Sequence, residues 1–321
     1  MEEKIRGNLK MHMQEEIEEN LKLTQKKDYY RGIGSELWSM VKNKKVIITG
    51  SGTSYNASVL LNYVLMRKGL LSHTIQSSEV RYLKGLDLSN YVSILFSHSG
   101  ESSDILGAAE ILKSAGSKTI SITDFPNSSL ARLTDAHFDG GAGEEKSIAA
   151  TKSHFAQTLI SLSILEKGEF DHSKDVLQGV LENENIKFFA EKMGNKAVLL
   201  GTGMNYPLAM EGALKLQETS EAITYHYPER EFLHGPIQIL SSEWSVIMLS
   251  TNPEIEKKVA IYDAHPIVVG NDPANEIFID SKEEINIHLG KLMALQLLSY
   301  YHAISMGMNP DSPSKLSKVV K

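Results

Sequence analysis

Residues 45–61, KVIITGSGTSYNASVLL, decide the fold. The run Lys45–Thr49 is apolar and has the length of a buried strand. The turn Gly50–Ser54 follows it, and the residues from about Tyr55 to Lys68 predict a helix. A strand that is followed by a turn rich in glycine and serine, and then by a helix N-terminus, favours an anion site. The reason is that unpaired N–H groups and the helix dipole both point toward the turn.

The hydroxyl content of this turn leaves two interpretations. An ordinary helix N-cap needs one Ser or Thr, whereas Ser51, Thr53 and Ser54 exceed that need. The turn contains neither the GK[ST] of a nucleotide-binding P-loop nor GxGxxG. The sequence therefore predicts either a simple cap or a site for a small anion, without a nucleotide fingerprint.

A second turn of the same kind follows another apolar run. Residues 92–96, VSILF, predict a strand, and residues 97–104, SHSGESSD, lead into a helix that extends to about Ser114. Lys118–Thr123 predicts a third strand. Two such turns in one parallel sheet can converge on one phosphate at the carboxyl ends of the strands. His98, in the second turn, is by itself more typical of packing or hydrogen bonding than of catalysis.

The strand–turn–helix pattern recurs in the second half of the chain. KAVLLGTGMNYPLAMEGAL begins at Lys196, and WSVIMLSTN, from Trp244, is similar to VSILFSHSG. In this copy Met204 and Asn205 replace the hydroxyl residues of the first turn. We therefore expect two domains of the same fold. The first would keep the anion site, and the second would have a different function.

Alternating apolar strands and helices predict an α/β protein of two doubly wound, mostly parallel sheets. Each would be a three-layer sandwich of the flavodoxin or Rossmann type. The two domains are expected at residues 30–175 and 176–308. Residues 1–29 predict a charged helical leader with an apolar stripe, and residues 309–321 have the composition of a frayed terminus. The remaining expectations are helices at about 151–165 and 282–306, a strand at 277–279 and a polar linker at 166–175.

The helix expected from about Leu208 to Ala222 carries three charged residues on one face. Glu211, Lys215 and Glu218 are spaced four and three residues apart. His234 follows in a His-Gly-Pro sequence, so a fold could gather a base, a cation and an acid. The alternative is an ordinary surface pair of Lys215 and Glu218, which would contribute ~0.2–0.5 kcal/mol.

The composition limits the possible functions. A net charge of −7 leaves no excess of Lys and Arg to neutralise the phosphates of nucleic acids. The absence of Cys excludes disulfides, thiolate metal sites and Cys nucleophiles within these 321 residues. No apolar run reaches the ~18 residues of a membrane span, and the start MEEKIRGNLK has no signal-peptide core. Because the His residues are also scattered, we expect a cytoplasmic protein with no metal, no cofactor and no nucleic-acid or membrane partner.

Several separated motifs resemble those of the double sugar-isomerase (SIS) domain family. They are GSGTSYNAS, SHSGESSD, GAGEEKSIAATKS, EGALKLQETS, HGP and PSKLSK, and their order and spacing match over about residues 30–321. They are similar in particular to the isomerase half of the glutamine–fructose-6-phosphate aminotransferases and to stand-alone deaminase-type relatives. The resemblance implies two SIS domains and a sugar phosphate as the ligand.

The resemblance also implies roles for individual residues. The phosphate would be bound by Thr53, Ser54, Ser97, His98, Ser99 and Ser102, and the sugar by Ser51, Gly52, Ile148 and Ala150. Glu218 would shuttle the proton, with Lys215 one turn before it. His234 would open the sugar ring from the neighbouring subunit of a homodimer. Lys318 would form an imine with the open-chain sugar, so the tail would be a lid, in contrast to the frayed terminus that its composition favours.

The sequence departs from the family at informative positions. His98 stands where the family has Gln, Ala150 stands where it has Ser, and there is no Cys for a glutaminase. We therefore expect glucosamine 6-phosphate and water to give fructose 6-phosphate and ammonia. The alternatives are a fructosamine-6-phosphate deglycase or a simple phospho-sugar isomerase. A non-catalytic sugar-phosphate sensor would be expected to lack the set Glu218, His234 and Lys318.

Overall fold

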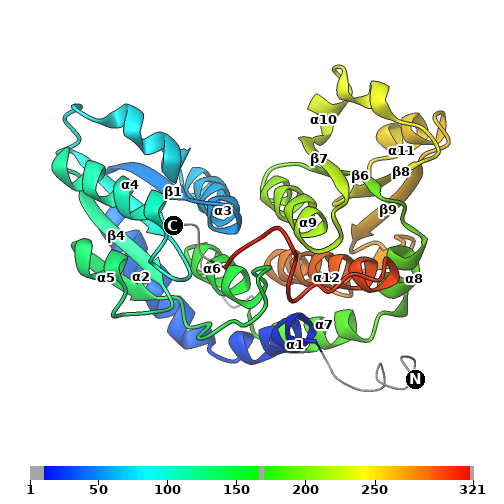
Figure 1. The fold of residues 1–321 in the computed structure, drawn as a ribbon, viewed down its shortest axis with the longest axis horizontal. Helices are drawn as coiled ribbons and strands as arrows, with labels where there is room; N and C mark the ends of the chain where they lie inside the picture. The colour runs from blue at the N-terminus through cyan, green and yellow to red at the C-terminus, as the bar shows by residue number, and fades with distance from the viewer. Residues whose placement is uncertain (1–10, 166–169, 319–321) are drawn as a thin grey trace.

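The protein is an α/β structure with two parallel five-stranded sheets (Figure 1). The computed structural model describes residues 11–165 and 170–318. The first sheet contains β1 (Lys45–Gly50), β2 (Ser72–Gln76), β3 (Tyr91–Phe96), β4 (Lys118–Thr123) and β5 (Ala136–Asp139). The second contains β6 (Lys196–Gly201), β7 (Ile223–Pro228), β8 (Trp244–Met248), β9 (His265–Gly270) and β10 (Ile277–Phe278).

The two sheets have the same topology. Their strand orders are β2-β1-β3-β4-β5 and, read from the other edge, β7-β6-β8-β9-β10. Val46 of β1 pairs with Ser72 and Val92, and Val198 of β6 pairs with Tyr225 and Val246. Each half therefore begins with a central strand, adds an edge strand on one side and then crosses back to the other. This confirms the internal repeat that the sequence predicts.

The glycine turns of the two halves have the same structural role. A Cβ on Gly50 would lie 2.5 Å from the carbonyl oxygen of Ser54, and one on Gly201 would lie 2.3 Å from that of Asn205. In both cases the obstacle is the backbone of the following helix, which cannot move aside cheaply. Gly52 and Gly203 then adopt positive φ angles of 54° and 59°, which glycine accepts without steric cost.

Helices cover the sheets and join them. They are α1 (His12–Thr24), α2 (Lys27–Val41), α3 (Thr53–Arg67), α4 (Ser103–Ser114), α5 (Ser129–Leu133), α6 (Lys152–Ser163), α7 (Ser173–Leu181), α8 (Glu184–Lys192), α9 (Asn205–Ser220), α10 (Glu229–Phe232), α11 (Pro253–Ala260) and α12 (Glu284–Ser305). Two 3₁₀ turns complete them, η1 (Ser77–Leu83) and η2 (Pro236–Ile239). Figure 1 shows the two sheets on either side of α6 and α12, with α1 and α7 below these helices.

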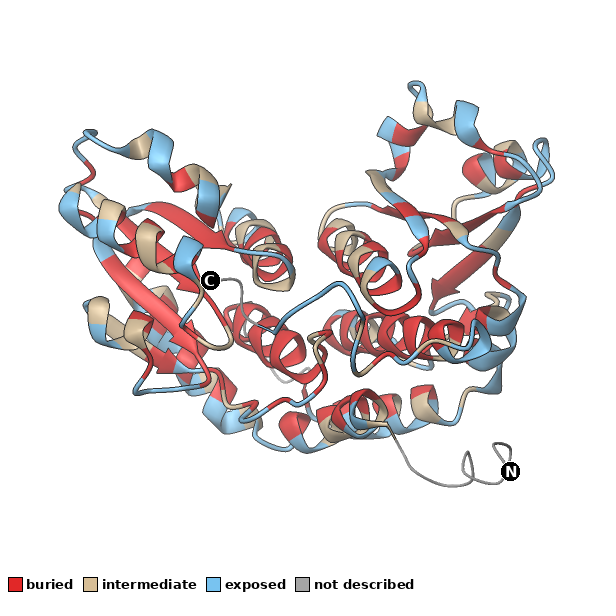
Figure 2. Cartoon of the chain, in the orientation of Figure 1, coloured by how far each residue is buried: buried red, intermediate tan, exposed pale blue. Residues whose placement is uncertain are grey.

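The two halves share one hydrophobic core. A single cluster of buried apolar residues runs from Ile48 in the first sheet through Leu159 of α6 and Leu295 of α12 to Leu199 in the second sheet. Every residue of α6 is buried, as Figure 2 shows in red at the centre of the molecule. Because full burial of one such side chain contributes about 1.5–3 kcal/mol, the halves stabilise each other.

Several predicted boundaries differ from the structure. The helix α9 begins at Asn205, three residues before the expected start, because Pro207 lies in its first turn, where proline is tolerated. The helix α3 begins at Thr53 rather than at Tyr55. The expected leader contains α1 and the first residues of α2, and its Met13 and Ile17 are fully buried. Its first ten residues lie outside the described residues.

The described part of the chain contains no helix long and apolar enough to cross a membrane. The expected polar linker at residues 166–175 falls partly outside the described residues. Its described end contains the buried Phe170 and the start of α7 at Ser173.

Candidate active site

The turns after β1 and β3 open into a cavity of about 260 Å³. This size suits a small metabolite, because pockets for drug-sized ligands are larger, about 300–1,000 Å³. The cavity is lined by most of the residues that the sequence singles out. These are Ser51, Gly52, Thr53, Ser54, Ser97, His98, Ser99, Ser102, Ile148, Ala150, Glu218 and Lys318. Residues from both halves and from the C-terminal tail therefore meet at one place.

The turn after β3 presents hydroxyls at the N-terminus of α4. The Ser97 hydroxyl accepts a hydrogen bond from the N–H of Gly100 at 3.0 Å, and the Ser99 hydroxyl accepts one from the N–H of Glu101 at 3.2 Å. Each of these hydroxyls keeps its own proton for another acceptor. Ser102 precedes the first helical residue, and its hydroxyl caps no N–H of the helix. The turn can therefore donate several hydrogen bonds to an anion, which the helix dipole also favours.

The turn after β1 is held by the neighbouring helices. The Ser54 hydroxyl accepts a hydrogen bond from Gln157 of α6 at 3.1 Å, so its proton can point to a ligand. The Thr53 hydroxyl donates to Glu211 of α9 at 3.2 Å. Thr53 thus lines the cavity but directs its hydroxyl proton toward the second half, whereas the resemblance placed it beside the phosphate.

The charged face of α9 is buried, so the prediction of an ordinary surface pair is wrong. The side chain of Lys215 is 0% exposed and that of Glu218 is 21% exposed. The Lys215 ammonium is bonded to the Glu218 carboxylate and lies 3.6 Å from the buried Glu211 carboxylate. Burial alone would lower the pKa of Lys215, but the Glu218 and Glu211 carboxylates raise it above its ordinary value. Lys215 is therefore a fixed cation behind Glu218.

Glu211 joins the two halves of the molecule. Its carboxylate accepts hydrogen bonds from Asn56 at 2.8 Å and from Thr53, both in α3. Burial alone would raise the pKa of Glu211, but His154, Lys215 and these two hydrogen bonds hold it below its ordinary value. Of the three charged residues on this face of α9, Glu218 is the one that lines the cavity. A single carboxylate of α9 can therefore contact a ligand.

Glu145, a buried carboxylate on the cavity wall, was not predicted from the sequence. Glu145 accepts hydrogen bonds from the N–H groups of Thr151 at 2.8 Å and Ser153 at 3.2 Å, at the N-terminus of α6. It also lies 3.2 Å from the ammonium of Lys318. Burial alone would raise the pKa of Glu145, but Lys318, His98 and these hydrogen bonds hold it at about 2. The signal that could have identified Glu145 was its place as a charged residue in the GAGEEKSIAATKS loop.

The C-terminal tail is attached to the site at two points. Lys318 donates to the carbonyl oxygen of Ser147 and pairs with Glu145. Asp311 accepts hydrogen bonds from the N–H groups of His12 at 2.8 Å and Met13 at 2.7 Å, where α1 begins. The described part of the tail is therefore ordered across the cavity, which contradicts the frayed terminus that its composition favours.

His234 does not reach the cavity within one chain. It follows α10, is exposed, and is not among the residues that line the cavity. Figure 1 shows α10 in the second half, away from the turn after β1. Its backbone N–H donates to the carbonyl oxygen of Glu231 at 3.0 Å. The structure thus brings together all of the predicted site residues except His234 and Lys215, which lies behind Glu218.

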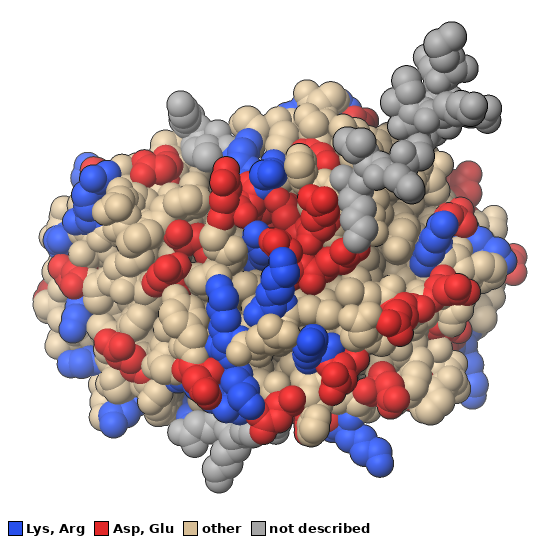
Figure 3. All heavy atoms as spheres, turned by 90° about the horizontal axis from the view of Figure 1, so that it is seen from below, with Lys and Arg blue, Asp and Glu red and all other residues tan. Residues whose placement is uncertain are grey.

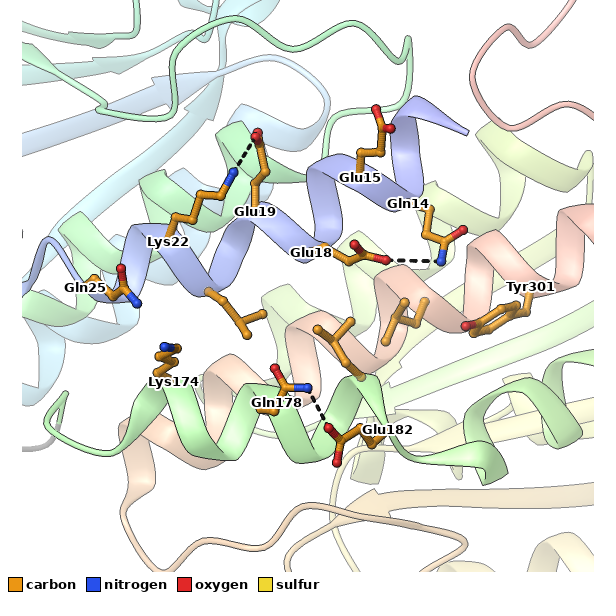
Figure 4. Close-up of a pocket in the computed structure, with 13 residues that line it drawn as sticks. Gln14, Glu15, Glu18, Glu19, Lys22, Gln25, Lys174, Gln178, Glu182 and Tyr301 are labelled. Carbon is orange, nitrogen blue, oxygen red and sulfur yellow. Dashed lines mark hydrogen bonds and ion pairs between the residues drawn. The ribbon is translucent and has the colours of Figure 1, made fainter. Parts of the chain in front are cut away.

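A larger groove of about 820 Å³ lies between α1, α7 and α12 on the lower face. Figure 3 shows acidic side chains gathered near the middle of this face. Figure 4 shows several of the polar side chains paired with each other, including Gln14 with Glu18 and Gln178 with Glu182. The groove lies away from the hydroxyl-rich turns and its rim is mostly acidic, so it offers little to a phosphate.

Metal-ligating residues do not cluster in the described residues. Within residues 11–165 and 170–318, no group of three or more His, Asp or Glu side chains could hold a metal ion.

Comparison with known sequences places the chain in a family. The SIS domain profile matches residues 39–166 and 193–265. The glutamine–fructose-6-phosphate aminotransferase (isomerizing) of Sulfolobus acidocaldarius is 30% identical over 302 residues, which cover 88% of this chain and 50% of that protein. The chain thus spans about half the length of this relative.

Solved structures share the fold. The C-terminal domain of the glucosamine–fructose-6-phosphate aminotransferase from Francisella tularensis superposes with a TM-score of 0.81 at 24% identity, covering 95% of this chain and 99% of that domain. A structure described as glucosamine-6-phosphate deaminase from Thermotoga maritima superposes with a TM-score of 0.77 at 23% identity, covering 96% and 99%. At these identities the similarity establishes the architecture alone.

Proposed function

This chain belongs to the SIS domain family, and on that premise we propose that it is a phospho-sugar isomerase acting on amino-sugar phosphates. One observation carries the proposal. A cavity of metabolite size combines two hydroxyl-rich turns at helix N-termini with one accessible carboxylate, Glu218, which is backed by the buried Lys215. The turns suit a phosphate group, and the carboxylate suits a proton transfer at the other end of the sugar.

Glu218 is proposed as the general base. In the open-chain aldose it would remove the proton from C2 and return it to C1, which converts the aldehyde carbon into a CH₂OH group. The Lys215 ammonium is bonded to this carboxylate from behind and fixes its position. Because the same carboxylate takes and returns the proton, one residue with access to both carbons is sufficient.

The phosphate would supply binding energy away from the reacting carbons. The hydroxyls of Ser97, Ser99 and Ser102 hold it in the ground state and in the transition state alike. Ser102→Ala is therefore expected to raise KM and to leave kcat nearly unchanged. A loss confined to kcat would count against this role.

The direction that we propose is deamination. Glucosamine 6-phosphate would isomerise to the imine of fructose 6-phosphate, and water would then add to C2 and release ammonia. Every atom of the products comes from the sugar phosphate and one water molecule. In this scheme Lys318, which reaches the cavity from the tail, is the amine available to bind the C2 carbonyl of the open-chain ketose.

Two related reactions use the same groups. A deglycase would release a larger amine from a fructosamine 6-phosphate, and the small side chain of Ala150 on the cavity wall leaves room for one. A simple isomerase would interconvert an aldose and a ketose phosphate. Both keep Glu218 and the serine turns and differ only in the leaving group.

His234 is proposed to act in the neighbouring subunit of a homodimer. Its exposed position beyond α10, outside the cavity of its own chain, supports this arrangement. Subunits of the inactive variants His234→Ala and Glu218→Gln can be mixed and allowed to exchange. If His234 acts across the interface, each mixed dimer has one complete site, and activity returns to about one quarter of wild type. If His234 acts within its own chain, no complete site forms and no activity returns.

The function is tested with a panel of phosphorylated sugars. Purified enzyme is incubated separately with glucosamine 6-phosphate, a fructosamine 6-phosphate and fructose 6-phosphate. Ammonia, free amine and the phosphorylated sugars are then measured. We expect ammonia and fructose 6-phosphate from glucosamine 6-phosphate. Turnover of another member of the panel without ammonia release would overturn the deaminase assignment, and turnover of none would overturn the isomerase assignment.

A further inference from the structure

The cavity wall carries few charges that can balance a phosphate. Its ionisable residues are His98, Glu145, Glu218 and Lys318. Lys318 is paired with Glu145, and Glu218 is paired with Lys215 behind the wall. A phosphate dianion bound in the cavity would thus meet lysines that carboxylates already neutralise. His98 is the remaining ionisable residue on the wall, and an imidazole side chain can carry a positive charge.

His98 is held rigidly by Asp124 at the end of β4. Its Nδ1 lies 2.8 Å from Oδ2 of Asp124, and its backbone carbonyl accepts the N–H of Asp124 at 3.1 Å. The other oxygen of Asp124, Oδ1, accepts the N–H of Ala142 at 2.7 Å, so the carboxylate is fixed as well. The edge of the ring packs against Phe125, with the ring centroids 5.4 Å apart.

The acceptor at Nδ1 leaves Nε2 as the ring nitrogen that is available to a ligand. The side chain of Asp124 is 1% exposed, and no Lys or Arg of residues 11–165 and 170–318 forms an ion pair with it, so its carboxylate accepts a hydrogen bond from Nδ1–H of His98. Nε2 is then the ring nitrogen with a free lone pair, at which an imidazolium would be formed. Because the side chain of His98 is 14% exposed and lines the cavity, a ligand can reach the ring.

The charged groups around His98 come from several elements. Asp124 faces it from the end of β4, Glu145 faces it from the loop before α6, and Lys318 lies beyond Glu145 on the tail. Behind Asp124 lie the ionisable residues Tyr29, Tyr30, His137 and Asp139. Asp124 and Glu145 are thus the carboxylates nearest to the ring, and an incoming phosphate would add a further negative charge on the cavity side.

We propose that His98 binds the phosphate of the substrate as an imidazolium and takes up a proton at Nε2 when the phosphate binds, with Asp124 as the positioning residue. The inference rests on the proposed function and deepens it, because it identifies the cation of the phosphate site. Phosphate affinity would then depend on pH above neutrality, where a phosphate monoester is already a dianion. The proton-coupled part of the affinity weakens by up to about tenfold per pH unit.

The test measures proton uptake directly. The binding of 2-deoxyglucose 6-phosphate, which lacks the C2 group needed for isomerisation, is followed by calorimetry at pH 8 in two buffers of different ionisation enthalpy. The difference in binding enthalpy between the buffers gives the number of protons taken up. We expect wild type to take up a fraction of a proton that approaches one per site. His98→Gln, which keeps a hydrogen-bond donor but cannot become charged, is expected to take up none.

Two further variants separate charge from structure. Asp124→Asn removes the negative charge behind the ring and should reduce the proton uptake while the fold is kept. Ser102→Ala is the matched control, because it removes a hydroxyl from the same cavity. It should weaken binding equally at pH 7 and pH 8.5 and leave the proton uptake of wild type unchanged.

The outcomes also separate this inference from the proposed function. Binding without proton uptake in wild type, or uptake that persists in His98→Gln, would overturn the role of His98 and leave the isomerase proposal intact. Failure of wild type to bind the probe would overturn the phosphate site, and the role of His98 with it. Proton uptake without turnover of any amino sugar would support His98 and count against the proposed reaction.

Discussion

Lys215→Met tests the buried charges that join the two halves. The methionine fills most of the volume of the lysine but removes the cation from a position that is 0% exposed. Glu211, 3.6 Å away and also buried, then loses its cation. Leaving one member of a buried ion pair without its partner typically costs about 3–5 kcal/mol. Because Thr53 and Asn56 still donate hydrogen bonds to Glu211, we expect the low end, about 3 kcal/mol.

The stability that Lys215→Met loses should depend on pH in a defined direction. In wild type the pKa of Glu211 is lowered, so its contribution is complete above the ordinary carboxylate range and is lost as the pH falls. In Lys215→Met burial dominates and the pKa of Glu211 rises. The variant then loses stability as the pH rises through that range, since the buried carboxylate must ionise. The deficit relative to wild type is therefore larger at pH 8 than at pH 5.5.

Urea unfolding at both pH values measures these differences. The double variant Glu211→Gln/Lys215→Met is the matched control, because it removes the unpaired charge as well as the cation. We expect it to be more stable than Lys215→Met alone. A cost below about 1 kcal/mol, the scale of an exposed ion pair, would refute the reasoning. So would a double variant that is no more stable than the single one.

Three further predictions concern individual residues. Glu218→Gln should lower kcat by about 10²–10⁴-fold while the calorimetric Kd for 2-deoxyglucose 6-phosphate stays near that of wild type; equal kcat values would remove Glu218 from its role. Gly50→Ala should destabilise the fold by about 1–3 kcal/mol in urea unfolding, because its Cβ would lie 2.5 Å from a backbone oxygen; Gly107→Ala, in an open helix position, is the control and should not destabilise. The pKa of Glu145, about 2 in the fold, predicts that acidification from pH 5 to pH 2.5 removes about 2 kcal/mol, a loss that is absent in Glu145→Gln if urea midpoints are compared.

The fold could be predicted where the signal is local. The central strands β1, β3, β6 and β8 are short apolar runs. All residues of β8 are buried, and in the other three strands every residue after the first is buried. Each of these strands precedes a turn that the sequence marks clearly. The edge strands β2 and β7 were missed because alternating exposure leaves them without an apolar run. β9 carries Pro266, which argues against a central strand, although the structure tolerates it near the strand start.

The site was predictable only in part, because its contacts join distant positions. Lys318 and Glu145 are 173 residues apart. His98 and Asp124 are 26 residues apart, and the sequence singled out His98 alone. Burial also changed the meaning of a local pattern. Lys215 and Glu218 have the spacing of a surface pair, but packing of α9 against α3 and α12 makes the lysine a buried cation.

The internal repeat accounts for the division of work between the halves. Both copies need the same glycine at the end of their first strand, since both helices approach the strand equally closely. In the first copy Thr53 and Ser54 stand where the second has Met204 and Asn205. The second copy supplies Glu218, which lines a cavity built mainly from the first. Neither half could therefore form this cavity without the other.

Transfer of the C2 proton by Glu218 is tested most directly by ¹H NMR of glucosamine 6-phosphate with wild-type enzyme in D₂O. We predict that the C2 proton signal disappears while fructose 6-phosphate and ammonia form in equal amounts. The same sample with Glu218→Gln should keep the C2 signal. Persistence of the C2 signal with wild type, or its loss at the same rate with Glu218→Gln, would contradict the central claim.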